Sequence, residues 1–239
     1  MKNNASVVLM YHSIGTPVEC EVGNSLYCVS VERFREQLGY ISGVIGSSGH
    51  HVTITFDDGD LTNYTQAYPV LKELGLKAYF FILVGRVGTT GYLSWDQIKE
   101  LKDNGMIIGS HGMTHKIMAA MNNSELDYEI SESKKILEDK LKTSIDYFSI
   151  PRGFYNDLII KKLKDSGYKV IFTSDQRDKD GFKVGRIPVK GSWSLQYFIS
   201  VLDGKYIFKD SVIESIKGVV KSALGSRGYD KLRSILIRK

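Results

Sequence analysis

The sequence predicts an α/β fold, a single distorted (β/α) barrel with seven parallel strands and outer helices. Two observations favour it. Short runs rich in β-branched and aromatic residues alternate with helical stretches, as in parallel strands joined by helices. No strand is followed by the Gly-x-Gly-x-x-Gly turn of a doubly wound sheet, so a closed or nearly closed barrel fits better than an open sheet.

The first half of the chain supplies three strands and three helices in alternation. Ser30 and Ser94 stand where a serine side chain caps the first turn of a helix. Gly75 and Gly105 stand where a glycine ends one. The expected strands cover 6–12, 51–59 and 77–83, and the expected helices cover 30–41, 64–75 and 94–105.

The second half continues the alternation with four strands and three helices. The expected strands cover 106–111, 146–151, 169–174 and 181–189, and the expected helices cover 124–141, 156–167 and 194–204. The 239 residues are 42% hydrophobic and contain no linker or repeat, so one domain with a sizeable core is expected. We place this domain at residues 1–205 and a basic helical tail at 206–239.

Polar side chains gather at the carboxyl ends of the expected strands. They are His12, the pair Asp57-Asp58, His111 and the turn at 151–153. In a parallel barrel these strand ends open on one face, where the chemistry of such folds collects. A histidine at a strand end or an Asp-Gly turn is ordinary when taken alone. Their common face is what makes a functional site the better interpretation.

His111 and His115 are four residues apart where a strand gives way to a loop. That spacing presents two imidazoles on one side of a turn, as metal sites often require. With one carboxylate of Asp57-Asp58 they form an incomplete shell for a divalent metal, most readily Zn²⁺, with Fe, Co or Ni as alternatives. The neighbouring carboxylate stays free to take a proton. Two exposed loop histidines are the alternative interpretation.

Three segments carry a resemblance to a known family. "TFDDGD", "SHGMTH" and "FSIPRGFYN", in this order and spacing, resemble the polysaccharide deacetylases, the NodB-homology domain of carbohydrate esterase family 4. The likeness extends from about residue 6 to 200. It implies a metal-dependent hydrolase that removes acetyl groups from N-acetylhexosamine units of a polysaccharide or glycan precursor, as in exopolysaccharide biosynthesis.

The resemblance also implies roles for individual residues. Asp58, His111 and His115 correspond to the metal ligands, and Asp57 corresponds to the general base for a metal-bound water. A backbone N–H in the turn after Pro151, that of Arg152, would help to hold the oxyanion.

The general acid of the commonest family pattern is a histidine near the C-terminal end of the domain, but no histidine follows His115. One branch, resembling the poly-N-acetylglucosamine deacetylases, is circularly permuted and brings the histidine in on a first strand that ends in Tyr-His. His12 in "LMYHSIG" matches that branch. The resemblance therefore implies His12 as the acid that protonates the departing amine.

The turn at 148–156 departs from the family pattern. Ser149 stands where an arginine often orients the base, and Arg152 replaces a tyrosine. Arg186 could supply the missing cation beside Asp57; the alternative is a surface arginine on a late strand. A carbohydrate-binding homologue without turnover and a hydrolase of another small C–N bond stay open as alternative functions.

The net charge of +5 bears on partners. From Lys221 onward the sequence has six basic residues and one acidic residue. The tail therefore carries the whole excess of positive charge, and the rest of the chain is neutral. A neutral body argues against nucleic-acid binding. The tail also carries apolar side chains, as an interfacial helix would, so peripheral membrane contact is a second hypothesis beside packing on the barrel.

The expected location is the cytoplasm, because no signal peptide or transmembrane segment is recognisable in the sequence. A cleaved secretion signal stays open as the alternative. Cys20 and Cys28 are expected to be free thiols, since no second pair completes a metal site.

Overall fold

Eight strands form one parallel sheet in a computed structural model that describes residues 6–15, 25–45 and 51–204. Their order is β7-β6-β5-β4-β3-β2-β1-β8, and every paired neighbour is parallel. This confirms the expected α/β barrel. The strands are β1 Ser6–Tyr11, β2 His51–Phe56, β3 Ala78–Ile82, β4 Ile107–Ser110, β5 Tyr147–Ser149, β6 Val170–Thr173, β7 Lys183–Gly185 and β8 Ile187–Pro188.

The last expected strand, 181–189, is divided, so the expectation of one strand there is wrong. β7 pairs with β6, whereas β8 pairs with β1 at the other end of the sheet. Arg186 alone separates the two, and its backbone N–H donates to Thr173 O at 3.1 Å. The chain thus crosses from one edge of the sheet to the other at a single residue, which brings the edges together and closes the barrel.

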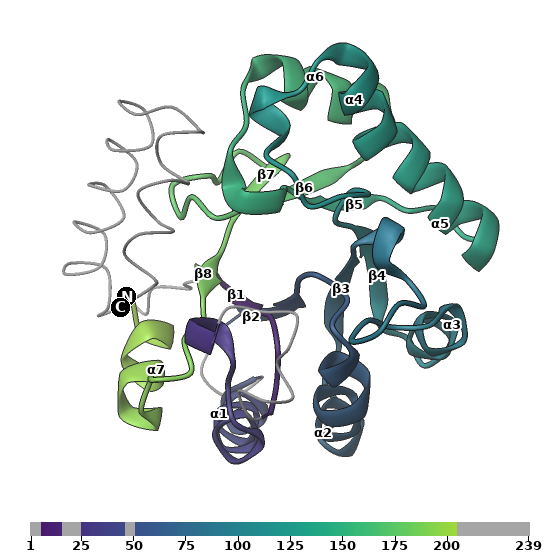
Figure 1. The fold of residues 1–239 in the computed structure, drawn as a ribbon. Helices are drawn as coiled ribbons and strands as arrows, with labels where there is room; N and C mark the ends of the chain where they lie inside the picture. The colour runs from purple at the N-terminus through teal and green to yellow at the C-terminus, as the bar shows by residue number, and fades with distance from the viewer. Residues whose placement is uncertain (1–5, 16–24, 46–50, 205–239) are drawn as a thin grey trace.

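Helices cover the outside of the strands, with α1, α2 and α7 below them and α4 and α6 above in Figure 1. The expected caps are confirmed: Ser30 and Ser94 accept the N–H groups of Arg33 and Gln97. Gly75 and Gly105 follow helix ends with φ of 65° and 80°. The helices are α1 Val31–Val44, α2 Tyr68–Glu73, α3 Trp95–Asp103, α4 Asn123–Asp127, α5 Ser133–Leu141, α6 Asp157–Asp165 and α7 Leu195–Leu202.

Short 3₁₀ and π segments complete the helical structure. The helix expected at 124–141 is α4 and α5 joined by the π turn η5 (Tyr128–Glu132), and a second π turn, η2 (Asn63–Ala67), precedes α2. The 3₁₀ segments are η1 Ser25–Tyr27, η3 Val84–Arg86, η4 Met118–Ala120 and η6 Pro151–Gly153. Among the described helices, none has both the length and the apolar character that crossing a bilayer demands.

Side chains on the two faces of the sheet form two apolar cores, because successive strand residues point to opposite faces. On the outer face Phe56 stacks between Tyr11 and Phe80, and the ring of Phe34 of α1 lies edge-to-face with those of Tyr11 and Phe56. The second cluster joins Val8, Phe81 and Phe172, from β1, β3 and β6. These strands are not neighbours in the sheet, so their contact places this cluster inside the barrel.

Candidate metal centre

The polar residues singled out at the strand ends come together at one face of the barrel. Asp57 follows the last residue of β2, and His111 follows the last residue of β4. β1 and β2 pair in register, with Tyr11 opposite Phe56, and the Asp57 N–H donates to Tyr11 O at 3.0 Å. His12 and Asp57 therefore leave adjacent strands side by side.

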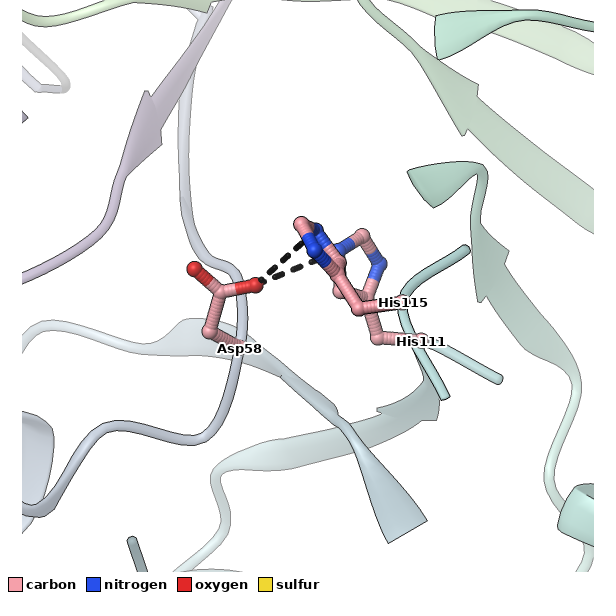
Figure 2. Close-up of side chains that lie close together, drawn as sticks. All are labelled: Asp58, His111 and His115. Carbon is pink, nitrogen blue, oxygen red and sulfur yellow. Dashed lines mark ion pairs between the residues drawn. The ribbon is translucent and has the colours of Figure 1, made fainter. Parts of the chain in front are cut away.

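Asp58, His111 and His115 converge on one point, as Figure 2 shows. Asp58 Oδ1 lies 3.5 Å from His111 Nε2 and 3.3 Å from His115 Nε2. The three ligand atoms all lie within 4.8 Å of one another. Zinc with ligand distances of about 2.0 to 2.1 Å spaces the ligand atoms of a tetrahedral site about 3.3 Å apart. The observed spacing from the carboxylate to each ring fits such an ion.

The surroundings of the three ligand atoms also fit a metal. Asp58 Oδ1 is buried and has no hydrogen-bond partner among the described residues. His111 Nδ1 lies 2.9 Å from Ser149 O, so Nδ1–H donates to that carbonyl, and Nε2, which faces Asp58, is the nitrogen left for a metal. A hydrogen bond of this kind fixes the tautomer of metal-binding histidines. The residues present can therefore hold a divalent ion.

The electrostatics around the three ligands suit a cation. Burial lowers the pKa of His115 to about 4, so its imidazole is neutral, as a ligand must be. Burial works against ionisation of Asp58, but the rings of His111 and His115 outweigh it and lower its pKa. Burial also lowers the pKa of His111, yet Asp57 and Asp58 reverse this and raise it, so negative charge attracts a proton where a metal would sit.

Backbone strain is concentrated at this site. Among the described residues four that are not glycine have positive φ, and three of them are site residues: Asp58 at 73°, His115 at 60° and Arg152 at 61°. Such conformations cost free energy and persist where the surrounding structure enforces them, often at functional sites. The loops at this site are therefore held in conformations that position the side chains of the site.

Asp57 forms a buried ion pair with Arg186. Arg186 Nη1 donates to Asp57 Oδ1 at 2.6 Å and Nη2 donates to Oδ2 at 2.8 Å. Arg186 is 1% exposed, and its guanidinium lies over the rings of Phe81 and Phe172 inside the barrel. Burial opposes ionisation of Asp57, but the charge of Arg186 outweighs it and lowers the pKa of that carboxyl. The alternative of a surface arginine is wrong.

Ser149, the last residue of β5, joins the same network. Its hydroxyl accepts from Arg186 Nη2 at 2.7 Å and donates to Asp57 Oδ2 at 3.1 Å. The cation beside Asp57 thus comes from the closure of the barrel between β7 and β8, and β5 contributes a small hydroxyl that leaves room for it. Asp57 Oδ2 is also 4.0 Å from His111 Nε2, so the carboxylate borders the ligand triad.

His12 lies beside this cluster at the end of β1. Its ring stacks on Tyr27 with centroids 5.0 Å apart, and its buried Nδ1 has no hydrogen-bond partner among the described residues. Burial lowers the pKa of His12, although Asp58 and Asp57 oppose that effect. The ring therefore holds a proton weakly.

Arg152 directly follows Pro151 in η6 and is the residue of that segment with a strained backbone. Its side chain is exposed, and its charge contributes to the lowered pKa of His115. The turn that carries the Arg152 N–H therefore lies beside the ligand triad.

Two acidic residues at this face escaped the sequence analysis. Asp60 accepts from the hydroxyl of Ser13 at 2.9 Å and from the N–H of Thr62 at 2.8 Å, which ties the end of β1 to the loop after β2. Glu129 contacts the loop between the two histidines. A third acid after "TFDDG" could have pointed to Asp60. The signal for Glu129 is an acid three residues after Leu126, on the same helical stripe as Ile130 and Leu137.

Comparison with known proteins finds a matching family profile, similar sequences and solved structures of the same fold. The sequence profile of the polysaccharide deacetylase family matches residues 46–171. A peptidoglycan-N-acetylglucosamine deacetylase of Bacillus cereus is 31% identical over 144 residues, 60% of this chain and 65% of that protein. A poly-β-1,6-N-acetyl-D-glucosamine N-deacetylase of Staphylococcus epidermidis is 28% identical over 174 residues, 64% of this chain and 59% of that protein. The chain thus spans less than two thirds of either relative.

A solved structure shares the fold. The deacetylase PplD of Streptococcus pyogenes, solved with acetate, superposes with a TM-score of 0.73 at 24% identity, over 82% of this chain and 97% of that one.

Proposed function

Because this chain belongs to the polysaccharide deacetylase family, we propose that it is a metal-dependent hydrolase that removes N-acetyl groups from N-acetylhexosamine units of a glycan. The observation that carries the proposal is the buried Asp57–Arg186 pair at the edge of the Asp58, His111 and His115 triad. In this pair the carboxylate of Asp57 is ionised and is not one of the three metal ligands. A module that only binds carbohydrate has no physical need for that arrangement.

The three ligands would hold a divalent metal, with Zn²⁺ the first candidate and Fe, Co or Ni as alternatives. Such an ion polarises an amide carbonyl and makes water more acidic. The neutral ring of His115 and the fixed tautomer of His111 keep the two nitrogen ligands available to it.

Asp57 takes the proton of the attacking water. An ionised carboxylate has about four acceptor positions, of which Arg186 and Ser149 fill three. The remaining one is open to a water molecule. Arg186 keeps the carboxylate ionised and, by its bidentate contact, also fixes the orientation of the group.

His12 gives a proton to the departing amine, and the Arg152 N–H helps to hold the oxyanion. Asp58 and Asp57 favour the charged form of His12, but burial outweighs them and lowers its pKa. A weakly held proton is readily donated, and the amine that forms accepts it strongly.

The substrate we favour is a polymer of N-acetylglucosamine. The Staphylococcus epidermidis relative is named for poly-β-1,6-N-acetyl-D-glucosamine and the Bacillus cereus relative for peptidoglycan N-acetylglucosamine. The position of His12 directly after β1 supports the first of these, since it matches the permuted branch. A non-catalytic carbohydrate-binding homologue and a hydrolase of another small C–N bond are the competing functions.

The oxidation state of Cys28 bears on the cellular location. Cys28 is disulfide-bonded, so the expectation of a free thiol is wrong there; Cys20 lies outside the described residues. Disulfides persist in oxidising compartments and are rare in the cytoplasm. This weighs against the cytoplasmic location expected from the sequence. The tail at 206–239 also lies outside the described residues, and its contact with a membrane stays a prediction.

Acetate release tests the proposed function. We expect the protein to release acetate from β-1,6-linked N-acetylglucosamine oligomers, and from chitin oligomers or peptidoglycan more slowly. Asp57→Asn keeps the size of the side chain but cannot accept the proton, so it should reduce release to the background rate. Release by Asp57→Asn at the full rate would remove Asp57 from the mechanism. Glycan binding without release by either protein would favour the carbohydrate-binding alternative.

A further inference from the structure

Glu129 is a buried carboxylate beneath the loop that carries the two histidine ligands. It is 2% exposed and accepts the backbone N–H groups of Met113, at 2.6 Å, and Thr114, at 3.0 Å, on the same oxygen. Its second oxygen accepts the hydroxyl of Thr114. All three donors lie between His111 and His115 in the sequence. One side chain therefore accepts three of the four hydrogen-bond donors of the short segment joining the ligands.

The helix that carries Glu129 is itself fixed to the same loop. Ser133, one turn further along the helix, pairs its hydroxyl with that of Ser110 at 2.8 Å, and Ser110 accepts the Gly112 N–H at 3.1 Å. Glu129 lies in the π turn η5, a helical irregularity that is frequent at functional sites. Hydrogen bonds from buried side chains of the helix, and not only water, thus hold the loop.

The loop adopts a shape that His115 disfavours. His115 has a φ of 60° and Gly112 a φ of 76°. A Cβ on Gly112 would lie 2.6 Å from Glu129 Oε2, so the close approach of the carboxylate requires glycine there. A strained segment that is not held by its neighbours relaxes to other conformations. The contacts of Glu129 help to prevent this, together with the hydrogen bond from Gly112 N–H to Ser110 and those from Val84 and Gly85 N–H to the carbonyls of Gly112 and Met113.

We propose that Glu129 is a positioning residue that holds the 111–115 loop in the conformation bringing His115 to Asp58. This inference rests on the proposed metal-binding function. Without Glu129 the N–H groups of Met113 and Thr114 lose their acceptor, the strain at His115 is released, and the His115 Nε2 atom leaves its place 3.3 Å from Asp58 Oδ1. The expected consequence is weaker metal binding, because groups that orient metal ligands contribute about 10- to 100-fold in affinity.

The test is the affinity for Zn²⁺, measured by competition with a chromophoric chelator on protein shown to be folded by circular dichroism. Glu129→Ala should bind Zn²⁺ about 10- to 100-fold more weakly than the wild type. Glu129→Gln should recover most of the affinity, since its amide oxygen can still accept both N–H groups. With Co²⁺ as the probe, the visible absorption of Glu129→Ala should differ from that of the wild type, because the ligand geometry changes.

The matched control is Glu138→Ala. Glu138 lies on the same helical run and accepts the Ile145 N–H at 2.9 Å, but it does not contact the histidine loop. This variant should bind Zn²⁺ as the wild type does. Folded Glu129→Ala with unchanged affinity would overturn the positioning role.

If Glu129→Ala does not fold, Thr114→Val decides the matter. It removes the hydroxyl donor to Glu129 from an exposed position, and unchanged affinity there would overturn the role as well. A wild-type protein that binds no Zn²⁺, Co²⁺, Fe²⁺ or Ni²⁺ would instead overturn the proposed metal-dependent function.

Discussion

Replacing Arg186 with methionine should lower the free energy of unfolding by about 3 to 5 kcal/mol, the usual cost of leaving one partner of a buried ion pair alone. Methionine fills a similar space but leaves the Asp57 carboxylate buried with Ser149 as its one side-chain donor among the described residues. Turnover should fall as well, because the carboxylate loses the cation that keeps it ionised and oriented. Urea denaturation monitored by circular dichroism measures the stability.

Arg177→Met is the matched control for Arg186→Met. Arg177 also makes a bidentate contact with an aspartate, Asp175, but its side chain is 77% exposed. Exposed pairs contribute about 0 to 1 kcal/mol, so this variant should unfold almost as the wild type does. The double variant Asp57→Asn/Arg186→Met should recover part of the lost stability, because no buried charge is left alone. Equal losses for Arg186→Met and Arg177→Met would contradict the buried pair.

The stabilisation by the Asp57–Arg186 pair depends on pH. The pKa of Asp57 is lower in the folded protein than in the unfolded chain. Its stabilising contribution is therefore present above the unfolded pKa of about 3.9 and is lost as the pH falls from there through the folded value. The stability difference between wild type and Arg186→Met should shrink over that acidic range.

Replacing His12 with alanine should reduce turnover by roughly 10²- to 10⁴-fold, the usual contribution of one general acid. The metal content should not change, since His12 does not belong to the ligand triad. Acetate release and metal analysis on the same preparation separate these two effects.

His51→Ala is the control for His12→Ala. His51 begins β2, at the other end of the barrel from the site, and is exposed. It should keep full turnover. A near-normal rate for His12→Ala would mean that the proton comes from water, and loss of its metal would make His12 a ligand or a folding residue.

Much of the fold and most of the site could be predicted from the sequence. Parallel strands place their carboxyl ends on one face, so Asp57 and His111 could be assigned to a common site from the strand pattern alone. His12 required one further step, the adjacency of β1 and β2, which the register of the two strands confirms.

The parts that escaped prediction depend on single residues and long-range contacts. The run at 181–189 is typical of one strand, and nothing in it shows that Arg186 divides it and reaches Asp57, 129 positions away. That contact depends on the closure of the sheet. Glu129 stands in a helix expected from its pattern, but its partners lie in a loop 15 and 16 positions earlier in the sequence.

The most direct test of the account is acetate release from N-acetylglucosamine oligomers by protein dialysed against a chelator. We predict that the stripped protein is inactive and that Zn²⁺, Co²⁺ or Ni²⁺, or Fe²⁺ under anaerobic conditions, restores release. In His111→Ala no metal should restore it, and the variant should retain no ion. Full release by the stripped protein, or by His111→Ala, would contradict metal-dependent deacetylation at Asp58, His111 and His115.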